Sequence, residues 1–225
     1  MMRNALRQPS GFAMRVISCL FTEHNLWLVA LAALVCVSGC WVSFRLFDRA
    51  LKSGGRLQRI GWLFQTGVAA GSSVWCTHFV AELAYDAKAP VTFDPLMTAE
   101  SLVIAIAGLG LGFAAASQIR RRFAPEIGGA MVGLAIPAMH YTGMAAYHVD
   151  GIMQWDIAYV VASLVASIAF SIAATSVAIR RPIPQSNYAA IALLVLGIVL
   201  LHFTAMAAIS IYPLMSVVSA TDISG

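Results

Sequence analysis

Three histidines recur at an interval of 62 residues, and each lies inside an apolar segment. The three copies of the surrounding motif read Thr77-His78-Phe79-Val80-Ala81-Glu82, Met139-His140-Tyr141-Thr142-Gly143-Met144 and Leu201-His202-Phe203-Thr204-Ala205-Met206. A fixed period of this length indicates an architecture of internal repeats. An ionisable side chain is costly in hydrocarbon, so its regular recurrence also indicates a functional site.

The composition is that of a membrane protein. Sixty per cent of the 225 residues are apolar and 11% are charged, and the mean hydropathy is +0.82. A spanning helix needs about 20 apolar residues. Six stretches meet this length, at about 26–47, 60–84, 98–119, 126–147, 156–179 and 188–213. We therefore expect an all-α integral membrane protein with six transmembrane helices.

Positive charges are concentrated in alternate connections between these stretches. The first, third and fifth connections carry Arg45, Arg49, Lys52, Arg56, Arg59, Arg120, Arg121, Arg122, Arg180 and Arg181. The second and fourth carry Asp86, Asp94, Asp150 and Asp156. The positive-inside rule places the odd connections in the cytoplasm and both chain ends outside. The net charge of +4 is thereby explained without a nucleic-acid partner.

The repeat divides the chain into three helix pairs. We expect an N-terminal interfacial segment at 1–25, a membrane domain at 26–215 with repeats at about 26–84, 98–147 and 156–213, and a C-terminal tail at 216–225. Each repeat holds an even number of helices, so the three copies share one orientation and surround a pseudo-threefold axis along the membrane normal. Each histidine then lies near the outer, periplasmic end of its helix.

Residues four positions apart share a helix face, so each histidine is paired with one further side chain. His78 is paired with Glu82, His140 with Met144 and His202 with Met206. Imidazole binds copper, zinc or iron, and thioether selects Cu(I). The pattern predicts a metal site with these six residues as ligands. The residues expected to support the ligands are Met139, Cys76, Tyr141, Phe79 and Phe203.

Structural interpretations stand beside this one. The histidines could instead hydrogen-bond neighbouring helices and hold the bundle together. Glu82 could reach interfacial water at its helix end, and Cys76 points to a different helix face from His78. His24 is interpreted as a surface residue beside Glu23, with a position over the outer mouth of the bundle as the alternative.

The motif residues resemble those of the MHYT family, bacterial integral-membrane sensor domains named for a Met-His-Tyr-Thr motif. Residues 139–146 match the motif in full, 201–208 match it closely, and 75–82 are similar to its first copy. The resemblance extends over about 23–213. It implies a sensory module of the bacterial cytoplasmic membrane that binds copper through His78, His140, Met144, His202 and Met206, with Met139 also in the motif. Oxygen, carbon monoxide and nitric oxide are the signals suggested for the family.

The sequence departs from the family pattern at three thioether positions. Thr77, Glu82 and Leu201 stand where methionines are usual. The departures disfavour a methionine-rich Cu(I) cage and favour a histidine-dominated site, or a site that prefers zinc or Cu(II).

Other functions fit the pattern less well. The chain carries no catalytic motif, so we expect no enzymatic activity of its own. A conduit for protons or metal ions could use Glu82 and the histidines. A haem with two histidine ligands would need space among three equivalent helices. Family members often carry cytoplasmic output domains, so we expect either a longer protein or a separate signalling partner.

Overall fold

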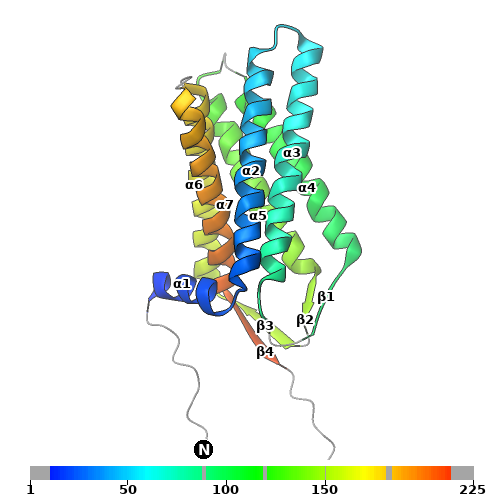
Figure 1. Ribbon diagram of the computed structural model, residues 1–225, viewed down its shortest axis with the longest axis vertical. Helices are drawn as coiled ribbons and strands as arrows, with labels where there is room; N and C mark the ends of the chain where they lie inside the picture. The colour runs from blue at the N-terminus through cyan, green and yellow to red at the C-terminus, as the bar shows by residue number, and fades with distance from the viewer. Residues whose placement is uncertain (1–10, 88–89, 119–120, 150, 181–183, 214–225) are drawn as a thin grey trace, which may run out of the picture.

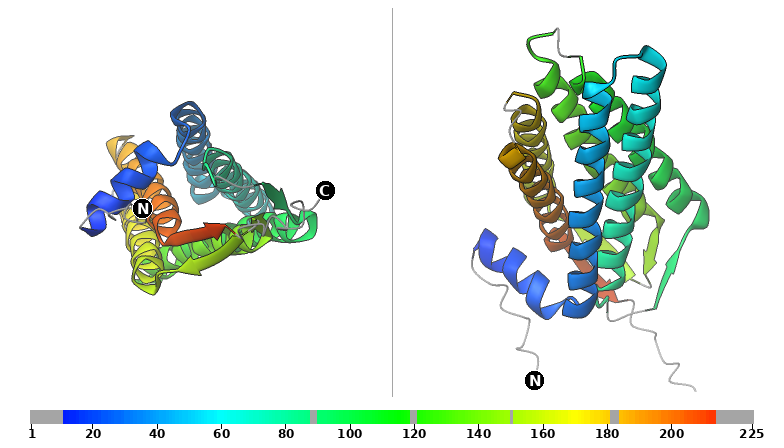
Figure 2. Two further views of the ribbon diagram at one scale, coloured as in Figure 1. Left: turned by 90° about the horizontal axis from the view of Figure 1, so that it is seen from below. Right: turned by 45° about the horizontal axis from the view of Figure 1, so that its top comes forward.

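Six long helices run side by side in the computed structural model, which describes residues 11–87, 90–118, 121–149, 151–180 and 184–213 (Figure 1). They are α2 (Leu26–Lys52), α3 (Arg56–Leu83), α4 (Pro95–Ala116), α5 (Ala124–Ala146), α6 (Ile157–Arg180) and α7 (Pro184–Ala207). Each helix packs against the next along the chain, and α2 packs against α7. Seen from one end, the bundle has a triangular outline (Figure 2).

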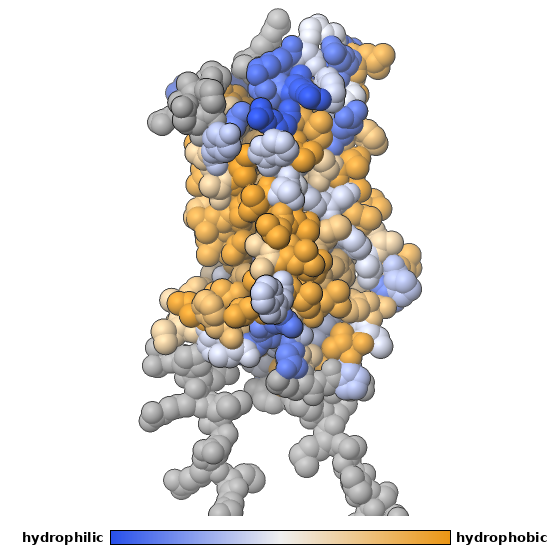
Figure 3. Space-filling view, in the orientation of Figure 1, coloured by the Kyte–Doolittle hydropathy of each residue, from blue (hydrophilic) through white to orange (hydrophobic). Residues whose placement is uncertain are grey.

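On the face seen in Figure 3, a broad apolar belt crosses the middle of the bundle, and hydrophilic residues gather at its upper end. Within the described ranges, four helices are long and apolar enough to cross a membrane: α2, α4, α6 and the Asn187–Ala207 part of α7. The motif helices α3 and α5 do not meet this criterion. Both carry polar side chains that face the inside of the protein, such as Thr66 and His140. A multi-pass membrane protein is therefore supported, whereas six crossing helices stay a prediction.

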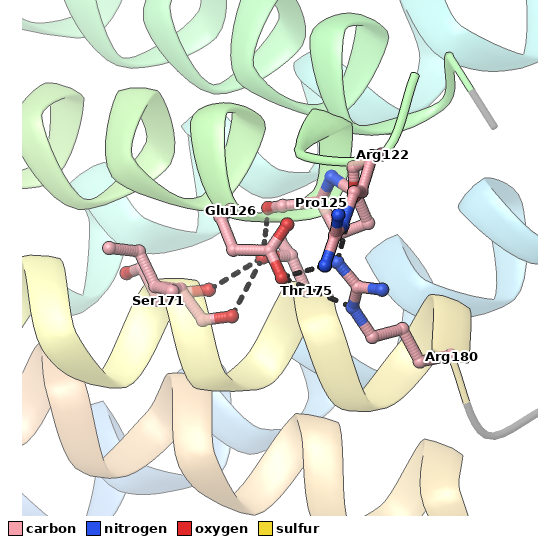
Figure 4. A network of polar contacts seen from close by, with 7 residues as sticks. Arg122, Pro125, Glu126, Ser171, Thr175 and Arg180 are labelled. Atoms are coloured by element: carbon pink, nitrogen blue, oxygen red, sulfur yellow. Dashed lines mark hydrogen bonds and ion pairs between the residues drawn. The ribbon is translucent and has the colours of Figure 1, made fainter. Parts of the chain in front are cut away.

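One end of the bundle, here called the basic end, contains the C-terminal ends of α2, α4 and α6 and the N-terminal ends of α3, α5 and α7 (Figure 1). Arg180 donates hydrogen bonds to Glu126 Oε1 from Nε at 3.1 Å and from Nη2 at 2.5 Å, and to the Arg122 carbonyl at 2.9 Å (Figure 4). Thr175 donates to the Pro125 carbonyl at 2.8 Å. These contacts hold α6 against the start of α5.

The opposite end, here called the strand end, contains a short helix in the region of the expected interfacial segment, and short strands that the sequence did not predict. The short helix is α1 (Phe12–Thr22), and the strands form two antiparallel pairs at the same end of the bundle (Figure 1). Strand β1 (Val91–Phe93) pairs with β2 (Tyr147–Val149), and β3 (Gly151–Trp155) pairs with β4 (Ile209–Pro213). The expected sixth span of 188–213 is therefore wrong at its end: α7 stops at Ala207, and the β-branched and aromatic residues beyond it pair with β3.

Helix α1 lies at the strand end with one face exposed. Phe12, Met14, Ile17 and Phe21 are about half exposed, whereas Cys19 is buried. Helix α1 therefore presents an exposed apolar face, whereas its placement at a membrane interface stays a prediction. Residues 1–10 of that segment, the expected tail at 216–225, Asp150, Arg120 and Arg181 lie outside the described residues.

One junction recurs at the start of α2, α4 and α6. Asn25, Asp94 and Asp156 cap these helices by accepting a hydrogen bond from a backbone amide in the first turn, which is the usual role of such residues at this position. The backbone amide of each cap also donates to a carbonyl at the end of a motif helix: Ala84 at 2.8 Å, Ala146 at 2.9 Å and Ala208 at 2.9 Å, in the same order. Each motif helix thus ends against the start of the helix before it in the chain.

Candidate functional site

The three motif histidines come together inside the strand end of the bundle. His78 on α3, His140 on α5 and His202 on α7 are 4%, 1% and 5% exposed. One nitrogen from each ring can be chosen so that all three lie within 4.8 Å of one another. Ring centroids are 4.7 Å apart for His78 and His140, 5.4 Å for His140 and His202, and 5.7 Å for His78 and His202. We call these three residues the histidine site.

A line of polar contacts leads from the histidine site to Glu82. Nδ1 of His140 lies 3.1 Å from Nδ1 of His78, so one of these nitrogens donates and the other accepts. Nε2 of His78 lies 3.4 Å from Oε2 of Glu82, which is 1% exposed. Burial and the carboxylates of Glu82 and Asp86 raise the pKa of the Tyr147 phenol to about 12, so Tyr147 stays neutral beside Glu82.

Several polar atoms of this cluster are buried without a hydrogen-bond partner among the described residues. They are Nε2 of His78 and His140, both ring nitrogens of His202, and both carboxylate oxygens of Glu82. Each such atom costs about 1–3 kcal/mol when nothing replaces the lost water. Because natural proteins satisfy nearly all buried polar groups, a concentration of unsatisfied ones at a single place indicates a binding site.

The backbone of α5 leaves room for the His78 ring. A Cβ atom at Gly143 would lie 2.4 Å from Nε2 of His78 and 3.0 Å from its Cδ2. The 62-residue period places Ala81 and Ala205 at the equivalent positions. The second repeat therefore carries glycine because the imidazole of the first repeat packs against its backbone.

Comparison with known proteins identifies the repeat. The MHYT family, described as a bacterial signalling protein N-terminal repeat, matches residues 71–129 and 133–191, which is just over half of the chain. The chain belongs to the MHYT family. The two matches include the motifs of His78 and His140. The third motif lies beyond them and rests on the 62-residue register and on the position of His202 beside the other two rings.

Relatives of this MHYT chain are signalling proteins. One from Caulobacter vibrioides, named an uncharacterized signaling protein, is 41% identical over 204 residues, which cover 88% of this chain and 24% of the relative. A bifunctional diguanylate cyclase/cyclic di-GMP phosphodiesterase, MucR of Pseudomonas aeruginosa, is 29% identical over 84% of this chain and 28% of its own length. The cyclic di-GMP phosphodiesterase NbdA of the same organism is 37% identical over 53% and 15%.

The chain thus spans about a quarter of these relatives or less. No solved structure matches it. The MHYT family is a sensory repeat of signalling proteins, so the prediction that this chain is not itself an enzyme is confirmed.

The other residues expected at the site lie around it in different ways. Phe79, Tyr141 and Phe203 each lie edge-on to the adjacent histidine, with ring centroids 4.8, 5.0 and 5.2 Å apart. Met144 and Met206 are buried together in an apolar cluster towards the strand end. Met139 belongs to the larger core cluster, which includes α2 and α4 residues. Cys76 is only partly buried on α3.

The surface interpretation of His24 is wrong. His24 is 6% exposed, and its ring centroid lies 6.3 Å from that of His202 and 5.2 Å from that of Phe203. Sequence reasoning missed this contact because His24 lies outside the His-containing motifs. The adjacent Asn25 could have indicated it. Asn25 follows His24 as Asp94 follows Phe93 and Asp156 follows Trp155.

Proposed function

We propose that this MHYT domain is a membrane sensor that binds a metal ion through His78, His140 and His202. The observation that supports the proposal most strongly is the convergence of three buried imidazoles, each of which has a ring nitrogen without a hydrogen-bond partner among the described residues. Copper is the metal we propose, with zinc as the alternative, because imidazole suits both ions.

The spacing of the rings fits a shared ion. Imidazole nitrogens bind such ions at about 2.0 Å, so the centroids of two rings on one ion lie roughly 5–6 Å apart. The three centroid distances of 4.7, 5.4 and 5.7 Å are close to this range. Met144 and Met206 follow their histidines by one helical turn, which places them towards the strand end as further soft donors.

The protein prepares the site through its surroundings. Phe79, Tyr141 and Phe203 shield the imidazoles from water. Glu82 supplies a carboxylate within ion-pair distance of His78 and orients that ring. A carboxylate that contacts a ligating histidine raises its basicity and fixes its tautomer. Copper, when bound, would supply a centre that changes redox state and binds diatomic gases.

We place the basic end in the cytoplasm and the strand end towards the periplasm of a bacterial inner membrane. The positive-inside rule supports this orientation. We further propose that all six long helices cross the bilayer as three parallel pairs around a pseudo-threefold axis. The threefold recurrence of the junctions at Asn25, Asp94 and Asp156 supports that symmetry.

The sensed signal must reach an output that lies elsewhere. Two relatives are named for the synthesis or hydrolysis of cyclic di-GMP. We propose that this domain regulates such an output domain, either within a longer protein or in a separate partner.

Metal analysis of the detergent-purified protein tests the proposed function. We expect one equivalent of copper, or of zinc, in the wild-type protein after reconstitution and washing. His140→Ala should lose this ion while retaining its helical circular dichroism. A wild-type protein that retains no copper, zinc or iron, with His140→Ala indistinguishable from it, would contradict the proposal.

A second candidate function rests on the line from His140 through His78 to Glu82. Contacts of 3.1 and 3.4 Å join groups that can each give and take a proton. Such a line is typical of proton relays in membrane proteins. Proton flux into proteoliposomes that falls on Glu82→Gln and on His78→Ala would favour a conduit over a sensor.

A further inference from the structure

His24 occupies the place that an apolar aromatic ring holds in the other two repeats. Backbone pairing aligns His24 with Tyr85, Phe93 with Tyr147 and Trp155 with Ile209. The partners Tyr85, Tyr147 and Ile209 are themselves 62 residues apart. His24, Phe93 and Trp155 each precede the capping residue of a long helix, so the three positions are structurally equivalent.

The side-chain contacts repeat in the same order. The Phe93 ring lies 5.9 Å from the motif residue Phe79, and the Trp155 ring lies 5.7 Å from the motif residue Tyr141. His24 completes the series at 5.2 Å from Phe203. Each of these rings therefore covers one motif from the strand end. Of these three rings, only that of His24 has a nitrogen lone pair that can bind a metal ion, because the indole nitrogen of Trp155 only donates a hydrogen bond.

One ring nitrogen of His24 makes a hydrogen bond, and the other has no hydrogen-bond partner among the described residues. Its Nδ1 lies 2.9 Å from the Cys19 carbonyl and donates to it, because a carbonyl only accepts. Nε2 therefore carries the lone pair of the neutral ring, and it is buried without a hydrogen-bond partner among the described residues. His202, whose ring centroid is 6.3 Å away, has two buried nitrogens in the same condition.

The backbone holds His24 firmly in this position. Asn25 donates its amide to the Ala84 carbonyl at 2.8 Å, and Asp86 donates its amide to the Glu23 carbonyl at 2.8 Å. These two hydrogen bonds tie the residues flanking His24 to the end of α3.

We propose that His24 Nε2 is a fourth imidazole ligand, which closes the histidine site from the strand end beside His202. The inference rests on the proposed metal at His78, His140 and His202. The centroid distance of 6.3 Å is slightly longer than the roughly 5–6 Å expected for two ligands of one ion, so the His24 ring has to move inward by a small amount. Because only Glu23 separates His24 from the end of α1, ion binding by His24 also restrains α1.

Competition for Cu(I) with a chromogenic chelator tests this inference, with three proteins compared in detergent. They are the wild type, His24→Phe and His140→Ala. His24→Phe is the matched variant, because Phe93 holds the equivalent position in the second repeat. We expect His24→Phe to bind Cu(I) roughly 10- to 100-fold more weakly than the wild type, the range typical for loss of one supporting interaction at a metal site. His140→Ala should bind more weakly still.

The outcomes separate the two proposals. Equal Cu(I) affinity of the wild type and His24→Phe, with weaker binding by His140→Ala, would overturn the role of His24 and leave the histidine site intact. If the wild type binds zinc but no Cu(I), the same three proteins are compared in a competition for zinc. Absence of both Cu(I) and zinc binding by the wild type would overturn the proposed function and this inference together. If His24→Phe does not purify as a folded protein, His24→Gln takes its place with the same expected loss.

Hydrogen exchange of α1 provides a second readout that affinity alone does not give. Cu(I) should slow the exchange of amides in Phe12–Thr22 of the wild type and leave it unchanged in His24→Phe. Equal slowing in both proteins would show that α1 responds without His24, and would contradict the proposed ligation.

Discussion

His140 and His78 face each other Nδ1 to Nδ1 at 3.1 Å, although 62 residues separate them in the chain. Two helices from neighbouring repeats bring these atoms together, and His202 from the third repeat lies beside both. The contact is a single neutral hydrogen bond, whose net contribution to stability is about 1 kcal/mol. It is therefore too weak to account for three buried imidazoles and a buried carboxylate, whereas binding of a cation would explain all four.

Adding one methyl group at Gly143 should damage the site selectively. The new Cβ atom would lie 2.4 Å from Nε2 of His78 and displace the ring. We expect Gly143→Ala to lower Cu(I) affinity at least about tenfold and stability by about 1–3 kcal/mol, as overpacking does. Chelator competition and thermal unfolding in detergent measure the two effects. Ala145→Val, on an exposed part of the same turn, is the control, and an equal loss in both variants would contradict this account of Gly143.

Replacing Glu82 should change which metal the site prefers. Glu82 stands where the other two motifs have Met144 and Met206. A carboxylate favours zinc or Cu(II), whereas a thioether favours Cu(I). We expect Glu82→Met to raise the ratio of Cu(I) to zinc affinity by about tenfold or more, and Glu82→Gln to lower zinc affinity without raising Cu(I) affinity. Identical ratios in all three proteins would place Glu82 outside the site's chemistry.

The contacts at the basic end should matter little for metal binding. The Arg180 and Glu126 side chains are about half and one-third exposed, and exposed ion pairs contribute about 1 kcal/mol or less. Arg180→Ala should therefore shift thermal unfolding only slightly and leave copper content unchanged. Loss of copper on this substitution would show that the two ends of the bundle are coupled more tightly than their separate contacts suggest.

Cys19 should resist alkylation while α1 is docked. Burial, together with the nearby Glu23 carboxylate, raises the pKa of the Cys19 thiol well above its usual range. Thiolate is the reactive form, so the labelling of Cys19 by a maleimide at pH 8 should be at least about tenfold slower than that of an exposed thiol. A protein with Ile17→Cys as its single cysteine is the control, because Ile17 is 51% exposed on the same helix. Equal rates would show that α1 is not held against the bundle.

The sequence predicted the three residues of the histidine site, but it did not predict the strands and His24, which cover the site from the strand end. The 62-residue interval was sufficient to identify His78, His140 and His202. Equivalent positions on three repeated helices can converge where the three helices approach one another. The same periodicity could not locate β4, since Ile209 and Ile211 are as apolar as the helix before them. His24 was missed because it differs in residue type from Phe93 and Trp155. The adjacent Asn25 was the one sequence clue to the equivalence, and backbone pairing of His24 with Tyr85 shows it directly.

The helix boundaries show where composition fails. Apolar stretches located the starts of α2 and α6 closely. The end of α2 was placed too early, because the helix continues through the charged residues Arg45 and Arg49 to Lys52. Charged residues do not end a helix that leaves the membrane. The motif helices α3 and α5 fall below the apolarity of a spanning segment for different reasons: α3 carries Arg56, Arg59 and several Gln, Ser and Thr residues, whereas α5 is rich in glycine and proline.

X-ray absorption spectroscopy at the copper edge of the copper-loaded protein tests the central claim most directly. We predict imidazole scattering from at least three rings at about 2.0 Å, with fewer rings in His78→Ala, His140→Ala and His202→Ala alike. A spectrum without imidazole scattering, or one that none of these three substitutions changes, would contradict a metal centre built from the repeated histidines.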